Sequence, residues 1–323
     1  MKSKLLNIPV MTLLVCCACG NSTQTGHSAP PVRNIDYDEI SHLQVINPEI
    51  PERMQFAGQT IDFDRVDRWE RLDRELTSLV YSHGNTLLML KRANKYFPEM
   101  APILKANGVS TDLLYLACVE STLDPLAYSP AKAAGFWQFI PSTAKEYGLE
   151  VNDYVDERYH LEKATAAACR YLKSAHRRYG NWESVASSYN RGIAGINRDL
   201  ESQGESSTFD IYLNRETSRY MFRILATKLI MENPEHYGFL LDESQLYQPV
   251  KTRTIEVNYP IDDLPAWAKE HGSNYQWLRE LNPWIRAKSL PNRTGKVYKI
   301  KLPADKNAIS RSRQEKHYFN PAN

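Results

Sequence analysis

The segment between residues 66 and 231 repeats one pattern, in which apolar residues recur every three or four positions and each run ends at a Gly, Asn or Pro. This spacing places the apolar side chains on one face of a helix, and the residues that end the runs are helix-stop signals. Such helices must bury their apolar faces against one another. We therefore predict that residues 56–240 form one all-helical domain and that the fold class is mainly α.

The positions of the runs predict the individual helices. The first begins near Val66. The second covers 86–97 and should stop before Pro98, because a residue that precedes proline disfavours the helical conformation. A third, shorter helix should end at Gly108, and the next one carries Glu120. The remaining predictions are helices at 141–147, 161–179, 182–189 and 211–231, and a polar loop at 201–208.

The periodicity changes after residue 245. Two segments alternate apolar and polar side chains as strands do, and two short helical segments lie between them. The expected order is a strand at 253–257, helices at 264–271 and 275–281, and a strand at 296–300. We predict that residues 241–305 form a small α+β module and that 306–323 are a tail.

The first residues read as an export signal. Lys2 and Lys4 precede an apolar stretch, residues 5–15, which is too short to span a bilayer. Three cysteines follow, and Cys19 comes directly after the small residue Ala18, an order that resembles a bacterial lipoprotein signal. We predict a signal peptide at 1–18, lipidation of Cys19 and a tether at 19–55. Lipidation of Cys17, or a plain secretory signal, remain as alternatives.

Cys118 and Cys169 are the two cysteines that remain after residue 19. An exported protein meets an oxidising compartment, so the two could form a disulfide. Both also fall on apolar helical faces, where a free thiol behaves as a small hydrophobe. We expect two buried free thiols and keep the disulfide as the alternative.

The net charge gives no reason to expect a nucleic-acid partner. The whole chain carries a formal charge of +2, and residues 1–18 contain two lysines and no acidic residue, so the rest is formally neutral. The basic surplus is confined to residues 250–323. We interpret it as a solvated surface.

Glu120 has the sequence surroundings of a catalytic acid. Its neighbours Leu116, Val119 and Leu123 are apolar, and burial among such residues raises the pKa of a carboxyl group. A glutamate that stays protonated near neutral pH can act as a general acid. The alternative is a structural glutamate in an ion pair. Asp124 is the nearest other carboxyl, and we expect it at a helix end or turn, because Pro125 follows it.

Four short motifs follow one another along the helical segment. They are Glu120-Ser121, Gly135-Phe136-Trp137-Gln138, Ser188-Tyr189-Asn190, and Glu216-Thr217 with Tyr220. In this order and spacing they resemble the lytic transglycosylases, and the Trp-Gln-Phe form is most similar to the membrane-bound D branch of that family. The resemblance implies a lysozyme-like catalytic domain. Residues 261–268, 278–283 and 299–303 resemble a LysM module.

The resemblance also implies a set of site residues. Glu120 would be the catalytic residue, and the substrate-binding residues would be Ser121, Ser129, Gln138, Tyr189, Asn190, Glu216 and Tyr220. Trp137 would form a wall of the groove. The resemblance implies neither a cofactor nor a metal.

The implied function is cleavage of the bond between N-acetylmuramic acid and N-acetylglucosamine in peptidoglycan. Glu120 would protonate the leaving oxygen and then take the proton from the C6 hydroxyl, which gives a 1,6-anhydro end. The alternatives are a hydrolytic muramidase of the goose-type lysozyme kind and a non-catalytic peptidoglycan-binding lipoprotein. The expected partners are peptidoglycan glycan strands and a membrane reached through Cys19, with the outer membrane facing the periplasm as the expected location.

Overall fold

The computed structural model of the chain describes residues 46–314, 316, 318 and 319. The signal peptide, Cys19 and most of the tether therefore lie outside the described residues. The described part is mainly helical, as predicted. It contains the helices α1 (Val66–Val80), α2 (His83–Ala106), α3 (Leu114–Ser121), α4 (Pro141–Glu146), α5 (Leu161–Tyr179), α6 (Trp182–Arg191), α7 (Ile193–Gln203), α8 (Arg215–Glu232), α9 (Leu264–Glu270) and α10 (Tyr275–Leu281). Among these, none is long and apolar enough to cross a membrane.

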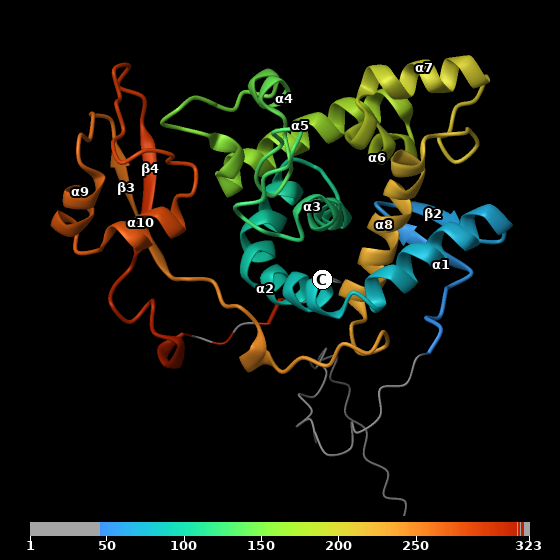
Figure 1. The fold of residues 1–323 in the computed structure, drawn as a ribbon, viewed down its shortest axis with the longest axis horizontal. Coiled ribbons are helices and arrows are strands. Elements are labelled where there is room, and N and C mark those ends of the chain that lie inside the picture. The colour runs from blue at the N-terminus through green and yellow to red at the C-terminus, as the bar shows by residue number, and fades with distance from the viewer. Residues whose placement is uncertain (1–45, 315, 317, 320–323) are drawn as a thin grey trace, which may run out of the picture. The chain divides into compact units, whose positions relative to one another are not determined.

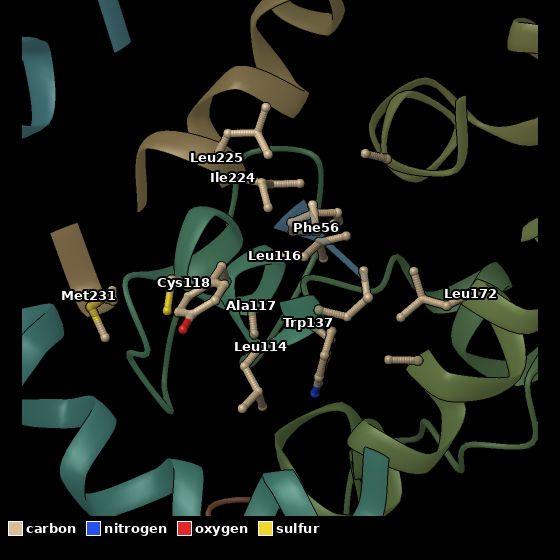
Figure 2. Close-up of a cluster of buried hydrophobic side chains, with 14 of the residues drawn as sticks. Phe56, Leu114, Leu116, Ala117, Cys118, Trp137, Leu172, Ile224, Leu225 and Met231 are labelled. Carbon is tan, nitrogen blue, oxygen red and sulfur yellow. The ribbon is translucent and has the colours of Figure 1, made fainter. Parts of the chain in front are cut away.

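Helix α3 is the centre of the helical domain (Figure 1). Its residues Leu114 to Cys118 are all buried, and it packs against α2 and α8. Figure 2 shows Leu116, Ala117 and Cys118 surrounded by Trp137, by Leu172 of α5 and by Ile224 and Leu225 of α8. A short helix with so apolar a sequence can only be buried on all sides. The packing fixes α3, and with it the position of Glu120 near its end.

Helix α2 runs through Pro98 and Pro102, so the prediction that a helix stops before Pro98 is wrong. A proline inside a helix costs about 3 kcal/mol, because it removes a hydrogen bond and clashes with the preceding turn. Here Phe97, Met100 and Leu104 are all fully buried on the same face of the helix. Burial of each such side chain contributes about 1.5–3 kcal/mol, so the three together offset the cost of the two prolines, which is about 6 kcal/mol.

The segment between α6 and α8 also differs from the prediction. Residues 193–203 form α7, whose Ile196 and Leu200 pack in a small cluster with Ile211 and Leu213. This helix was not predicted, because its apolar stripe is only two turns long. Helix α8 begins at Arg215 rather than near 211, since the Asn214 side chain accepts a hydrogen bond from the Thr217 amide and caps the helix.

A hairpin precedes the helices. Strands β1 (Arg53–Phe56) and β2 (Gln59–Asp62) are antiparallel, with Arg53 opposite Asp62. Phe56 and Ile61 are buried in the main core, and the amide of Ala57 donates to Asp112 Oδ2 at 2.6 Å. The hairpin thus belongs to the helical domain, although β1 begins inside the segment that the sequence predicts as a tether.

The C-terminal module has the predicted order of elements. Strands β3 (Thr252–Val257) and β4 (Tyr298–Pro303) pair antiparallel, with Ile255 opposite Ile300, and α9 and α10 lie between them in the chain. The core of the module contains Trp267, Leu278, Ile285 and Leu302, together with three residues of the helical domain: Ala134, Val155 and Tyr159. The two parts therefore share a core.

Cys118 and Cys169 are buried and not bonded to each other. The prediction of two free thiols is confirmed. Burial raises the pKa of the Cys169 thiol to about 11, so this group stays protonated and unreactive at neutral pH.

Candidate active site

Glu120 is the next-to-last residue of α3, and the Tyr220 hydroxyl donates a hydrogen bond to its Oε1. Burial raises the pKa of the Glu120 carboxyl from 4.5 to about 7. The hydrogen bond from Tyr220 lowers that pKa, the charge of Glu216 raises it and Arg223 lowers it, all less strongly than burial. The carboxyl group can therefore both give up and accept a proton near neutral pH, as its apolar neighbours in the sequence predict.

Helix α8 supplies the groups that face Glu120. Tyr220 is buried, and burial raises its pKa well above the ordinary value, so its hydroxyl remains a donor. Glu216 stands one turn earlier and is exposed, and Arg223 donates to its Oε1 at 2.6 Å. This ion pair lowers the pKa of Glu216, so Glu216 is ionised where Glu120 is protonated.

A buried charge cluster under α8 was not predicted. Glu75 of α1 is 2% exposed and accepts from Arg219 at 2.6 Å, from Arg223 at 3.2 Å and from Arg74 at 3.0 Å. It therefore holds Arg223, one of the charges that acts on Glu120. The sequence contained a signal for it, since Glu75 falls on the apolar stripe of α1 and the two arginines of α8 are four residues apart.

Residues 122–140 connect α3 to α4, and we call 125–140 of this connection the catalytic loop. The Gln138 side-chain amide donates to the carbonyl oxygens of Ala127 at 3.2 Å and Gly135 at 2.8 Å, so it holds the loop in shape. Ser129 Oγ accepts from the Ala133 amide at 3.1 Å. Ser121 is buried, and its hydroxyl makes 3.0 Å hydrogen bonds to the carbonyls of Ala117 and Phe136. All three residues, which the resemblance predicts to bind substrate, make hydrogen bonds to backbone atoms.

Tyr189 and Asn190 lie at the end of α6. The Tyr189 hydroxyl donates to the Trp137 carbonyl oxygen at 2.7 Å, and the charge of Glu120 raises the pKa of Tyr189 in addition to burial. Tyr189 is therefore close enough to Glu120 to respond to its charge, and it ties α6 to the catalytic loop. Asn190 is exposed, and its Oδ1 accepts from the Thr217 hydroxyl of α8 at 2.9 Å.

Trp137 is not a wall of a groove. Its side chain is fully buried within the hydrophobic cluster (Figure 2). Its Nε1 donates to the Thr165 hydroxyl of α5 at 3.0 Å. The sequence prediction for this residue is wrong, because the indole of a tryptophan whose N–H finds a buried partner can be placed wholly inside a core.

Gly135 lies against the backbone of a neighbouring segment. A Cβ atom at this position would stand 2.1 Å from the carbonyl oxygen of Arg158, and its φ of +73° also favours glycine. Arg158 is buried and donates from Nη1 to the carbonyls of Lys132 at 2.6 Å and Phe139 at 3.0 Å. Asp156 holds this guanidinium with hydrogen bonds of 2.7 and 2.9 Å. Arg158 and Asp156 are thus the anchor of the catalytic loop.

Asp124 does not stand beside Glu120. The left-handed residues Thr122 and Leu123 turn the chain directly after α3. Asp124 Oδ1 then accepts from the Leu126 amide at 2.9 Å, and its other oxygen lies 3.5 Å from Arg92. The prediction of a turn residue is confirmed.

A cavity of about 400 Å³ lies behind the catalytic loop rather than at Glu120. Its lining combines Tyr96 of α2 and Phe136 of the loop with Asn282, Trp284 and Lys301 of the C-terminal module. Within the part of the chain that the structure describes, no cluster of His, Cys, Asp and Glu is arranged to hold a metal ion.

Two family models match the chain. Residues 101–211 match the transglycosylase SLT domain, and residues 253–306 match the soluble lytic transglycosylase C-terminal LysM-like domain. The first match spans Glu120, the catalytic loop and Tyr189 but ends before α8. The chain therefore contains an SLT domain followed by a LysM-like module, which confirms the resemblance seen in the motifs.

Relatives agree with this assignment. The membrane-bound lytic murein transglycosylase D of Escherichia coli K12 is 33% identical over 229 residues, which is 68% of this chain and 48% of the relative. The membrane-bound lytic murein transglycosylase C of Haemophilus ducreyi is 28% identical over 153 residues, which is 42% of this chain and 40% of the relative. The chain thus spans about half the length of the D-type relative. Among solved structures, the 70-kDa soluble lytic transglycosylase of Escherichia coli is 17% identical and covers 55% of this chain and 33% of its own, with a TM-score of 0.36.

Proposed function

We propose that this chain is a lytic transglycosylase that cleaves the bond between N-acetylmuramic acid and N-acetylglucosamine in peptidoglycan and leaves a 1,6-anhydro end. The observation that carries the proposal is Glu120, a buried carboxyl with a pKa of about 7 that accepts a hydrogen bond from Tyr220 and lies in an SLT domain. Substrate-assisted glycosidases are the enzymes that work with one protein carboxyl, because the sugar supplies the second group.

In the first step Glu120 gives its proton to the glycosidic oxygen as the bond from C1 to that oxygen breaks. The acetamido oxygen of the muramic acid residue stabilises the positive charge that develops at C1. Tyr220 donates to Glu120 Oε1, so we assign the transferred proton to Oε2. The product strand leaves with this proton, and Glu120 is then a carboxylate.

In the second step the Glu120 carboxylate takes the proton of the C6 hydroxyl of the same sugar. The C6 oxygen attacks C1, the new bond closes the anhydro ring, and the acetamido group is released. Glu120 ends the cycle protonated, and no water is consumed. A group that acts as acid and then as base needs a pKa near the working pH.

The other site residues have supporting roles in this proposal. Asn190 near the end of α6 and Glu216 in the first turn of α8 are exposed, and we assign both to contact with the glycan. Ser121, Ser129, Gln138 and Tyr189 make the backbone hydrogen bonds described above, and we assign them to positioning the catalytic loop against Glu120.

The products of digestion test the reaction. We expect the purified protein to release muropeptides that carry 1,6-anhydromuramic acid from isolated peptidoglycan, as measured by mass spectrometry. Muropeptides with only reducing muramic acid ends would mean that water reaches C1 and that the enzyme is a hydrolytic muramidase. If no muropeptide is released from any peptidoglycan, a binding protein becomes the better interpretation.

We also propose that the protein is exported and held at a membrane facing the periplasm through a lipid on Cys19. The support is the signal pattern of residues 1–18 and the membrane-bound relatives. One lipid chain gives only marginal binding, so stable anchoring needs two or more chains on the cysteine. We expect the protein to sediment with membranes and to be released by detergent but not by high salt, because its net charge is small.

The Cys19→Ser variant should appear in the soluble fraction or keep its signal peptide, as judged by fractionation and N-terminal mass. Cys17→Ser is the matched control and should remain in the membrane fraction. The assignment to Cys19 fails if Cys17→Ser alone releases the protein, and the anchor itself fails if the wild type is soluble with an unmodified N-terminus.

A further inference from the structure

We propose that the C-terminal LysM-like module positions the catalytic loop, and that Lys296 and Glu157 are the positioning residues through which it does so. The inference rests on the proposed function only in what the loop does, because the contacts themselves involve no substrate. They form a continuous path from the module, through residues 150–158, to the loop beside Glu120.

The path begins where two extended segments, residues 154–156 and residues 284–286 of the module, run side by side. The Asp156 amide donates to the Trp284 carbonyl at 2.8 Å, and the Arg286 amide donates to the Tyr154 carbonyl at 2.8 Å. Val155 and Ile285 form a bridge between these two bonds and are both buried. Backbone bonds of this kind fix the position of one segment relative to the other, because buried amides and carbonyls are costly to leave unpaired.

Ion pairs also join the module to the segment 150–158. Glu157 is 2% exposed, and its oxygens accept from the Glu150 amide at 2.9 Å, from Lys163 at 2.5 Å and from Lys296 of the module at 3.1 Å. Lys296 also donates to Glu150 at 2.5 Å. Although burial opposes it, these donors hold the pKa of Glu157 below the ordinary value. One ammonium group of the module therefore joins two carboxylates of the 150–158 segment.

The path ends at the catalytic loop. Asp156 lies between the backbone contact with Trp284 and the guanidinium of Arg158, and Arg158 holds the loop at Lys132 and Phe139. Ala134 of the loop is itself part of the core of the module. A shift of the module at this edge must therefore move Asp156, Arg158 and the loop together.

The module has a second charged contact, whose carboxylate partners lie on α2 and α5 rather than in the 150–158 segment that holds Arg158. Lys301 lies 2.6 Å from Glu99 of α2 and 2.5 Å from Glu162 of α5. It joins two carboxylates as Lys296 does, and its side chain is 24% exposed against 39% for Lys296. The two lysines are thus a matched pair. They differ in the segment that carries their carboxylate partners: residues 150–158 for Lys296, and α2 and α5 for Lys301.

The test compares Lys296→Glu with Lys301→Glu in the full chain. Each change sets a like charge against two carboxylates, so both loosen the docking of the module. We expect Lys296→Glu to speed hydrogen exchange in peptides that cover 127–139 and to lower kcat by about tenfold with little change in KM, because displacement of about 1 Å at a catalytic centre costs up to about 10²-fold in rate. Lys301→Glu should leave the exchange rate of the loop and kcat near the wild-type values. Lys296→Arg keeps the positive charge and should also leave them near the wild-type values.

The exchange measurement needs no substrate, so it decides the inference even if the protein proves inactive on peptidoglycan. If both reversed variants speed exchange in the loop, or neither does, or only Lys301→Glu does, the positioning role is wrong. Should Lys296→Glu fail to fold, as judged by circular dichroism, Lys296→Met gives the same comparison against Lys301→Met.

Discussion

Replacing Glu120 with glutamine will lower the rate of muropeptide release by about 10²–10⁴-fold, the usual contribution of a general acid and base. Glutamine keeps the shape of the side chain and can still accept from Tyr220, but it has no proton to transfer. The rate on isolated peptidoglycan measures the loss, and circular dichroism shows that the fold is kept. Turnover close to the wild-type rate would remove Glu120 from the mechanism.

Asp124→Asn is the matched control, since it changes the nearest carboxyl in the sequence in the same way. Asp124 interacts with the Leu126 amide and Arg92 rather than with Glu120, so we expect this variant to retain substantial activity. Equal loss in both variants would instead indicate a pair of catalytic carboxylates.

The raised pKa of Glu120 predicts how both activity and stability depend on pH. The reaction begins with a protonated carboxyl, so the rate should fall as pH rises through about 7. The folded state also holds this proton more tightly than the unfolded state, so ionisation of Glu120 destabilises the fold as pH rises from 4.5 to about 7. At about 1.36 kcal/mol for each unit of pKa, the cost above pH 7 is about 3 kcal/mol.

Glu120→Gln lacks this cost. Chemical denaturation should therefore show the variant to be more stable than the wild type above pH 7, with the difference disappearing below pH 4.5. A difference that is constant across this range would mean that burial does not set the pKa of Glu120.

Gly135→Ala will have the second large effect. The new Cβ would stand 2.1 Å from the Arg158 carbonyl oxygen, so either the loop or the 150–158 segment has to move. Overpacking costs about 1–3 kcal/mol, and the left-handed backbone adds about 1–2 kcal/mol. We expect the free energy of unfolding to fall by about 2–5 kcal/mol and the rate by about 10²-fold, because the loop lies beside Glu120.

Gly108→Ala separates these two costs. Gly108 has a φ of +66°, close to that of Gly135, but a Cβ there would have nothing within 4 Å. Its replacement should cost only the backbone strain and leave the rate unchanged. If the two variants lose the same stability and both keep full activity, the contact with Arg158 is unimportant.

The sequence predicts the elements whose ends carry their own signals. Helix α5 has the predicted bounds because Gly180 ends it in the left-handed conformation, and the module has its predicted order of strands and helices. Helix α2 could not be predicted, because burial of Phe97 and Leu104 from distant contacts decides that it continues through two prolines. Local signals give the preference of a segment, and tertiary packing can override it.

The site residues likewise divide into those that neighbouring sequence predicts and those that depend on distant partners. Glu120 and its raised pKa could be predicted from the apolar residues next to it in the sequence. Glu75 on the apolar stripe of α1 indicates a buried charge, but its partners and those of Arg158 could not be predicted, because they are far away in the chain: Arg219 lies 144 residues from Glu75, and Arg158 binds the loop at Lys132, 26 residues away. Only the structure shows that Arg158 anchors the loop.

The corner after α3 also decides where Asp124 lies relative to Glu120. Had α3 continued, Asp124 would follow Glu120 by four residues and lie on the same face one turn away. Thr122 and Leu123 instead adopt left-handed conformations with φ of 49° and 55°, at a cost that most side chains avoid. Leu123 is fully buried, which keeps the corner in place. Two left-handed residues thus turn Asp124 away from the helix face that carries Glu120, and in the proposed mechanism the sugar takes the role that Asp124 would have had.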